Sequence, residues 1–177
     1  MRKYIALFRG INVGGRNKLP MRELTEVLET VGLDAVKTYI QSGNVVFQTH
    51  QSNLAELAEQ ITAAIEISHG FAPKILILSS RELEEAIAVN PFPEAEEHPK
   101  TLHLFFLDEE PHAPDFERLE QRKRASEGFE LIGKVFYLHA PDGIGRSKLA
   151  SQVEKAMGVT VTARNWRSVC KISEMAN

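Results

Sequence analysis

A glycine-rich segment near the N-terminus has the residue types of an anion-binding loop. Residues 10–18 read GINVGGRNK and join an apolar run to a helical pattern. Consecutive glycines allow backbone N–H groups to converge on an anion, and Arg16 and Lys18 add positive charge beside them. The alternative is a tight turn that needs a positive φ at Gly14 or Gly15. The chemistry in question is therefore binding of a phosphate or a similar anion.

The same segment does not satisfy the P-loop motif of nucleotide-hydrolysing enzymes. Gly10 and Gly15 have the glycine spacing of that motif, but Arg16 and Asn17 stand where it needs Lys followed by Ser or Thr. The hydroxyl that would bind Mg²⁺ is missing, and the predicted helix begins several residues too late. A weaker anion-binding loop is compatible with these differences.

A second glycine-rich segment, DGIGRSK at residues 142–148, also precedes a predicted helix. Ser147 is a candidate N-cap, and the N–H groups of a first helical turn can hold a phosphate. A capped helix start after a glycine turn is the more common alternative. Arg164 and Asn165 follow the last predicted strand and are expected at the same edge of the sheet as this loop.

The remaining reactive side chains indicate no catalytic or metal site. The six histidines lack metal-ligand spacing. The single cysteine, Cys170, excludes an internal disulfide and has no histidine near it in the sequence. Glu84 and Glu85 are adjacent and would not share a helical face. We predict no metal and no cofactor, and no set of residues identifies a reaction.

The elements that must position these residues follow a repeated order. In the first half, apolar runs and helical spacing predict, in order, a strand at 4–13, a helix from Pro20 to Gly32, strands at 35–41 and 44–49, a helix from Asn53, a strand at 74–78, and a helix from Ser79 toward Asn90. In the second half they predict a strand at 102–107, a helix at 114–125, strands at 129–132 and 135–139, a helix from Ser147 to Gly158, a strand at 159–162, and a helix from about Arg164.

Each half therefore reads strand, helix, strand, strand, helix, strand, helix. The first six elements are the split βαβ order of ferredoxin-like domains. We predict an α+β fold with two ferredoxin-like halves, each with an extra trailing helix. Residues 1–89 form the first half and residues 101–177 the second. Residues 90–100, NPFPEAEEHPK, contain three prolines and are predicted to be a linker.

This topology brings the candidate residues together. The third strand of a ferredoxin-like sheet lies antiparallel to the first, so the loop at Gly14–Gly15 should meet the turn at Ser42–Asn44. The candidate ligand-binding residues are Arg9, Asn12, Gly14, Gly15, Arg16, Lys18, Gln41, Ser42 and Asn44 in the first half, and Gly143, Gly145, Arg146, Ser147, Arg164 and Asn165 in the second. If the two loops form one site, the cationic side chains Arg9, Arg16, Lys18, Arg146, Arg164 and Arg167 should share one side of the molecule.

Composition and charge narrow the class of protein. The chain has 177 residues, of which 43% are hydrophobic and 25% charged, which is ordinary for a folded soluble protein. No apolar run reaches the ~20 residues of a membrane span, and the N-terminal apolar run stops at Arg9. We predict a cytoplasmic protein with no membrane partner. Residues 1–50 carry a net charge of +3, residues 51–132 of −10 and residues 133–177 of +4, so both ends are basic.

Several long motifs resemble those of a known bacterial family. The segments FRGINVGGRNKLPM, TYIQSGNVVF, NPFP, GIGRSKL and TARNWRSV occur in this order, and the series is similar to that of the family called domain of unknown function 1697. The resemblance implies a two-part α+β protein with ferredoxin-like character. It carries over no catalytic residue, because the family has no assigned activity. Arg167 and Ser168 stand where the family pattern has Asn and Thr, which weakens any role for an amide or a hydroxyl there.

Three classes of function remain open. The favoured one is binding of a small phosphorylated or nucleotide-like anion at the glycine-rich loops. The second is nucleic-acid binding, which is disfavoured because the RNP1 pattern is absent, the first strand is apolar on both faces and the pI is about 6.1. The third is an interaction or scaffold protein without a ligand site. The sequence does not define an oligomeric state.

Overall fold

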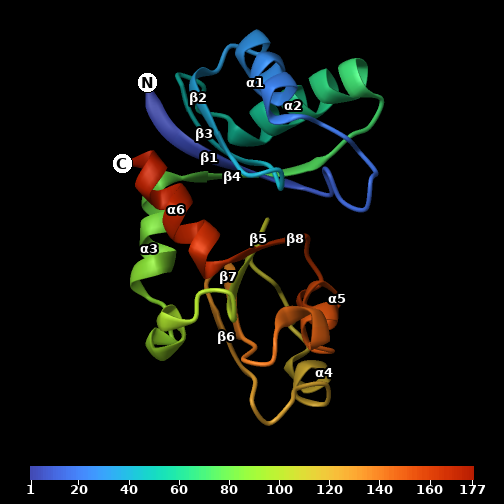
Figure 1. Ribbon diagram of the computed structural model, residues 1–177, viewed down its shortest axis with the longest axis vertical. Helices are drawn as coiled ribbons and strands as arrows, with labels where there is room; N and C mark the ends of the chain where they lie inside the picture. Colours follow the sequence, from blue (N-terminus) through green and yellow to red (C-terminus); the bar gives the residue numbers. More distant parts are fainter. The chain divides into compact units, whose positions relative to one another are not determined.

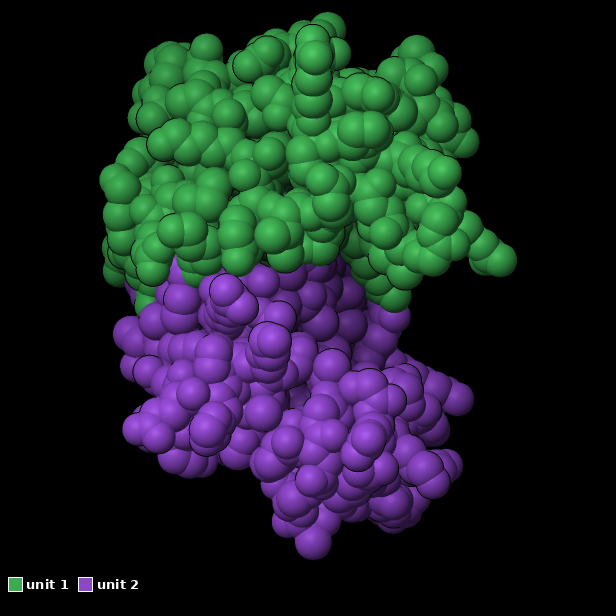
Figure 2. Space-filling model, viewed as in Figure 1, with its two compact units in different colours: residues 1–84, 171–177 green, residues 85–170 purple.

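The computed structural model describes all 177 residues, which form two compact units (Figure 2). Unit 1 comprises Met1–Glu84 and Lys171–Asn177, and unit 2 comprises Glu85–Cys170. The chain therefore leaves unit 1 within one helix and returns to it within the last helix. That residues 1–89 and 101–177 are separate domains stays a prediction.

Unit 1 contains a four-stranded antiparallel sheet with the order β2-β3-β1-β4. This is the ferredoxin-like strand order that the sequence predicts. The pairing of Leu7 with Asn44 brings the end of β1 to the start of β3. The elements of this half, in chain order, are β1 (Arg2–Arg9), α1 (Met21–Thr30), β2 (Asp34–Tyr39), β3 (Asn44–Thr49), α2 (Leu54–His69), β4 (Lys74–Ser79) and α3 (Ser80–Ala88).

Helices α1 and α2 cover one face of this sheet (Figure 1). Most of the residues that helical spacing places on the apolar faces are fully buried there, namely Leu24, Leu28, Leu57, Ile61 and Ile65. Val27 and Val31 are half-buried at the border of the same cluster. The helical spacing of apolar residues thus corresponds to a core beneath α1 and α2, with Val27 and Val31 less buried than the others. The alternate β1 residues Ile5 and Leu7 are buried as well, as an unbroken apolar strand indicates.

Side-chain caps explain where α2 and α3 begin. The Asn53 side chain accepts a hydrogen bond from the Glu56 N–H at 3.2 Å at the start of α2. At α3 the Glu82 N–H donates to Ser79 Oγ at 3.2 Å, and the Ser79 N–H donates to the Glu82 carboxylate at 2.7 Å. This reciprocal pair is a capping box. Both caps lie at the residues where the sequence predicts these helices to begin.

Unit 2 repeats the topology with shorter helices. Its antiparallel sheet has the order β6-β7-β5-β8. The elements of this half are the 3₁₀ helix η1 (Pro93–Glu97), β5 (Leu102–Leu107), α4 (Phe116–Glu120), β6 (Gly128–Ile132), β7 (Val135–His139), the 3₁₀ helices η2 (Ile144–Arg146) and η3 (Ala150–Gln152), α5 (Val153–Met157), β8 (Val161–Asn165) and α6 (Trp166–Ala176).

None of the chain's helices combines the length and the apolar character that crossing a membrane requires.

The core of unit 2 is rich in aromatic side chains. The rings of Phe105 and Phe136 meet edge to face with centroids 5.8 Å apart, and Phe129 stacks on Phe136 at 5.4 Å. The buried Tyr137 hydroxyl donates to the Ala86 carbonyl at 2.6 Å. Burial raises the pKa of Tyr137 to about 12, so this hydroxyl stays a donor.

Two predicted elements differ in length from the observed ones. The first strand ends at Arg9 rather than at residue 13, because Gly10 has a φ of +77° and turns the chain out of the sheet. The helix predicted over 114–125 ends at Glu120, because Leu119 is its one buried residue and residues 120–126 offer no apolar face to continue it. Asp115 caps this helix through the Arg118 N–H at 2.9 Å.

Two further differences lie in the second half of unit 2. The helix predicted after Ser147 is divided into η3 and α5. The strand predicted at 159–162 instead runs over Val161–Asn165, because Arg164 pairs with Leu104 and Asn165 with His103. The last helix therefore begins at Trp166, where the Asn165 side chain accepts from the Ser168 N–H at 2.9 Å.

Candidate functional site

The glycine-rich loop of unit 1 lies against the β2–β3 turn, as the topology predicts. The Asn12 side chain donates to the Gln41 carbonyl at 2.9 Å, and the Phe8 N–H donates to the Gly43 carbonyl at 2.8 Å. The Asn44 amide instead donates within its own hairpin, to the Tyr39 carbonyl at 3.0 Å. The Asn12 side chain therefore joins the two segments.

Two asparagines close the base of this loop. The Leu19 N–H donates to Asn12 Oδ1 at 2.8 Å, and Asn12 Nδ2 donates back to the Leu19 carbonyl at 2.8 Å. The Asn17 side chain donates to the Gly10 carbonyl at 2.9 Å. Both asparagines have a positive φ, which asparagine tolerates better than most residues. Side-chain amides thus hold the chain on both sides of the loop, at Gly10 and at Leu19.

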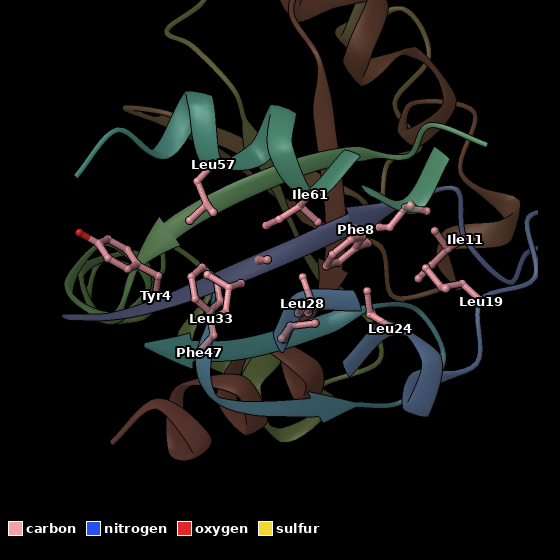
Figure 3. Close-up of a cluster of buried hydrophobic side chains, with 13 residues drawn as sticks. Tyr4, Phe8, Ile11, Leu19, Leu24, Leu28, Leu33, Phe47, Leu57 and Ile61 are labelled. Carbon is pink, nitrogen blue, oxygen red and sulfur yellow. The ribbon is translucent and has the colours of Figure 1, made fainter. Parts of the chain in front are cut away.

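Two buried apolar side chains, one on each side of the loop, anchor it to the core. Ile11 is 1% exposed and Leu19 is fully buried. Figure 3 shows both side chains beside Phe8 and Leu24, at one end of the core cluster. The residues that flank the loop, Ile11 and Leu19, therefore belong to the core of unit 1.

Gly43 allows the turn to approach this close. A Cβ atom placed on Gly43 would lie 2.5 Å from Ile11 Cδ1 and 2.6 Å from Phe8 Cβ, which is far inside van der Waals contact. Its φ of +76° is also unfavourable for residues with a side chain. A glycine at this position is required both by space and by backbone conformation.

The tip of the loop is a two-residue turn. Gly14 and Gly15 have φ values of +58° and +75°, and the Arg16 N–H donates to the Val13 carbonyl at 3.0 Å. Positive φ at both central residues defines a type I′ turn. The tight-turn alternative therefore accounts for both glycines. The Arg16 and Asn12 N–H groups are engaged within the loop, so neither is available to an anion.

Exposed cationic and apolar side chains lie at the tip of the loop and next to it. Arg16 and Lys18 are exposed, and neither has an ion-pair partner. Val13 is 65% exposed, and Ile40 in the adjacent turn is 50% exposed. Gln41 and Ser42 are exposed beside them, whereas Asn44 is buried and Arg9 is half-buried at the end of β1. The exposed cations are the chemically distinctive groups of this region.

The second glycine-rich loop has a different construction. Gly143 has a φ of +95° and leads into η2. Ser147 Oγ accepts from the Ala150 N–H at 3.0 Å, which confirms the predicted cap. The N–H groups of Arg146 and Ser147 donate to the carbonyls of Gly143 and Ile144. Gly145 and Arg146 are exposed, but the Arg146 and Ser147 amides, two of those expected to face an anion, are satisfied within the loop.

Arg164 and Asn165 are strand residues in β8. Asn165 caps α6, so its side-chain oxygen serves the helix. Arg164 is half-buried and donates to the Ala163 carbonyl at 2.9 Å. Burial lowers the pKa of its guanidinium to about 10, so this side chain is still cationic at neutral pH. That the two glycine-rich loops form one site stays a prediction.

Unit 2 also contains a cavity that the sequence did not indicate. Its volume is about 800 Å³, and its lining consists of residues 97–101 with Glu94, His139, Pro141 and Arg167. None of the candidate ligand-binding residues lines it. The segment from Asn90 to Lys100, which the sequence predicts to be a linker, contains η1, and its Ala95 is buried. Composition alone could not indicate that this segment would form one wall of a cavity.

Each unit is thus an α+β sandwich with ferredoxin-like strand order, and no three His, Cys, Asp or Glu side chains are grouped to hold a metal ion. The chain belongs to the family described as "Protein of unknown function (DUF1697)", whose model matches residues 1–137. The GIGRSKL and TARNWRSV motifs lie beyond the matched residues.

One solved structure extends the likeness over the whole chain. The conserved bacterial protein SP0830 from Streptococcus pneumoniae is 24% identical, with a TM-score of 0.73 and coverage of 99% of both chains. At this identity the likeness shows the fold alone. No curated protein matches the chain.

Proposed function

We propose that unit 1 binds a small phosphorylated or nucleotide-like anion at the tip of the loop formed by residues 12–17. The observation that carries the proposal is a fixed type I′ turn with the unpaired cation Arg16 beside an open surface, and a second unpaired cation, Lys18, two residues further on. A phosphate group suits them because it combines negative charge with several strong acceptor oxygens. Arginine is especially suited to contact two such oxygens at once.

The hydrogen bonds within the loop support the proposal. The turn is closed by the Arg16 N–H, and the loop base is closed by Asn12 and Asn17. Little backbone freedom is then lost when a ligand binds, which favours affinity. Gln41 is exposed on the adjacent turn, where its side-chain amide offers a neutral hydrogen-bond donor to the same ligand.

The two alternative classes receive less support from this region. Nucleic-acid binding by a ferredoxin-like sheet uses exposed residues of the central strands, but Tyr4 to Phe8 of β1 are all buried. A scaffold without a ligand would use Val13 and Ile40, which are exposed. Two isolated apolar side chains are ordinary on a protein surface and need no partner.

Isothermal titration of the full chain with inorganic pyrophosphate and with ATP tests the proposal. We expect saturable binding that the double variant Arg16→Ala/Lys18→Ala weakens by at least about tenfold, as loss of charge-assisted hydrogen bonds predicts. Lys155→Ala is the matched control, because Lys155 is an exposed lysine of unit 2 without an ion-pair partner. Absence of binding to the unmodified protein, or an equal loss in the control, would contradict the proposal.

A further inference from the structure

The cavity of unit 2 shares no residue with the proposed anion site. It lies where β5 begins and β7 ends, between the segment that precedes Thr101 and the residues that follow His139. Its volume of about 800 Å³ falls within the range of small-molecule pockets. The cavity is thus large enough for a ligand of the size of an amino acid or a short peptide.

Hydrogen bonds and two prolines fix the backbone that lines the cavity. The His98 carbonyl accepts hydrogen bonds from both the N–H and the hydroxyl of Thr101, each at 2.8 Å. The Thr101 carbonyl accepts from the Ala140 N–H at 2.8 Å and ties this segment to the end of β7. Pro99 and Pro141 line the cavity with rings of fixed φ. A site with such walls is formed before a ligand arrives.

The imidazole of His139 is also fixed in position. The Phe92 ring packs on it with centroids 5.9 Å apart. Gly128 allows this packing, because a Cβ atom there would lie 2.9 Å from Phe92 Cε1. His139 and the two prolines give the cavity an apolar and aromatic lining between its charged residues.

Four charged side chains line the cavity, and they are of both signs. Glu94 and Glu97 come from η1, Lys100 precedes β5, and Arg167 lies in the first turn of α6. All four are exposed, and none takes part in an ion pair. The lining thus offers two carboxylates and two cations that do not satisfy one another.

We infer that this cavity binds a zwitterionic ligand of the amino-acid or short-peptide class. Lys100 and Arg167 receive the ligand's carboxylate, Glu94 and Glu97 receive its ammonium group, and the apolar lining around His139 receives its side chain. The balance of charges decides the class. A phosphate or a simple cation is attracted by one pair of these side chains and repelled by the other, whereas a zwitterion can pair with charges of both signs.

NMR titration of the ¹⁵N-labelled full chain with the common L-amino acids and glycyl-L-leucine, each added singly, tests this inference. We expect saturable shifts at the Lys100, Thr101 and Arg167 amides with at least one of them. The N-acetylated and C-amidated forms of that ligand should each bind at least about tenfold more weakly, because each removes one charge-assisted hydrogen-bonding group.

Charge-neutral variants of the same size complete the test. Arg167→Gln and Glu97→Gln should each weaken binding, whereas Arg122→Gln, at an exposed arginine outside the cavity, should not. The inference is overturned if no compound produces saturable shifts at these amides, or if the N-acetylated ligand binds as well as the free one. It is also overturned if inorganic phosphate displaces the ligand at the same concentration. None of these results depends on pyrophosphate binding by Arg16 and Lys18.

Discussion

The two glycine-rich loops have similar compositions but different constructions. In unit 1, the Asn12 side chain ties the loop of residues 12–17 to Leu19, the buried Ile11 and Leu19 anchor it, and Arg16 and Lys18 have no ion-pair partner. In unit 2, Gly143 leads into a short 3₁₀ turn in which the Arg146 N–H donates to the Gly143 carbonyl. Both loops carry exposed cations. Glycine content therefore does not predict a ligand site; the hydrogen bonds of Asn12 and Asn17 at the base of the first loop distinguish the two.

The largest difference should appear when a methyl group is added to Gly43, in the turn that packs against the first loop, or to Gly143, in the second loop. Gly43→Ala combines a positive φ with a collision against Ile11 and Phe8, so we expect a loss of about 4 kcal/mol in the free energy of unfolding. Gly143→Ala has a positive φ but open space around it, and should lose about 1–2 kcal/mol. Gly145→Ala, with neither feature, is the control. Urea unfolding measures all three, and equal losses at Gly43 and Gly143 would refute the role of close approach.

Removal of the Asn12 side chain should have the next largest effect. Asn12→Ala removes three side-chain hydrogen bonds, to Leu19 and Gln41, and leaves alanine at a φ of +54°. We expect a loss of about 3 kcal/mol in unfolding free energy. Hydrogen exchange should show faster opening of the amides of residues 10–19. If these amides keep their protection, the hydrogen bonds of the Asn12 side chain do not hold the loop in place.

A histidine gives unit 2 a pH dependence. Burial lowers the pKa of His103 to about 4, and its Nδ1 has no hydrogen-bond partner. Below the ordinary pKa of about 6.5 the unfolded chain binds a proton that the folded unit does not, so stability falls as the pH decreases. This contribution should approach about 3 kcal/mol near pH 4.

Comparison of the unmodified protein with His103→Leu isolates this effect from the titration of carboxylates. The variant should lose less stability between pH 7 and about pH 4, as followed by hydrogen exchange of β5 amides. Parallel pH profiles for the two proteins would show that His103 does not titrate as its burial predicts.

The smallest effect is expected at the cap of the second loop. Ser147→Ala removes the hydrogen bond from the Ala150 N–H, and we expect a loss of about 1 kcal/mol. The change should leave binding of pyrophosphate unaltered. Thermal unfolding and titration of one sample measure both quantities, and weaker pyrophosphate binding in this variant would assign the anion to unit 2.

The features that could be predicted from the sequence are those set by local chemistry and by topology. The caps at Asn53 and Ser79 depend on residues three apart. The contact between the loop and the turn follows from strand order, because β1 and β3 are neighbours in any ferredoxin-like sheet. Apolar spacing correctly placed Leu24 and Leu28 in the core.

The features that escaped prediction depend on contacts between distant segments. Arg164 and Asn165 lie in β8 because they pair with β5, about sixty residues earlier. The cavity near His139 exists because Phe92 packs on that ring and folds a proline-rich segment against it. The internal use of the amides around Ser147 likewise depends on a backbone geometry that glycine content does not specify.

One NMR titration with pyrophosphate compares both loops of the full chain directly. We predict saturable shifts of the Gly14, Gly15 and Arg16 amides, with no saturable shift at Gly143, Gly145 or Arg146. The shifts at the first loop should be lost in Arg16→Ala/Lys18→Ala. Saturable shifts confined to the second loop, or no saturable shift at either, would contradict the claim that the first loop is an anion site.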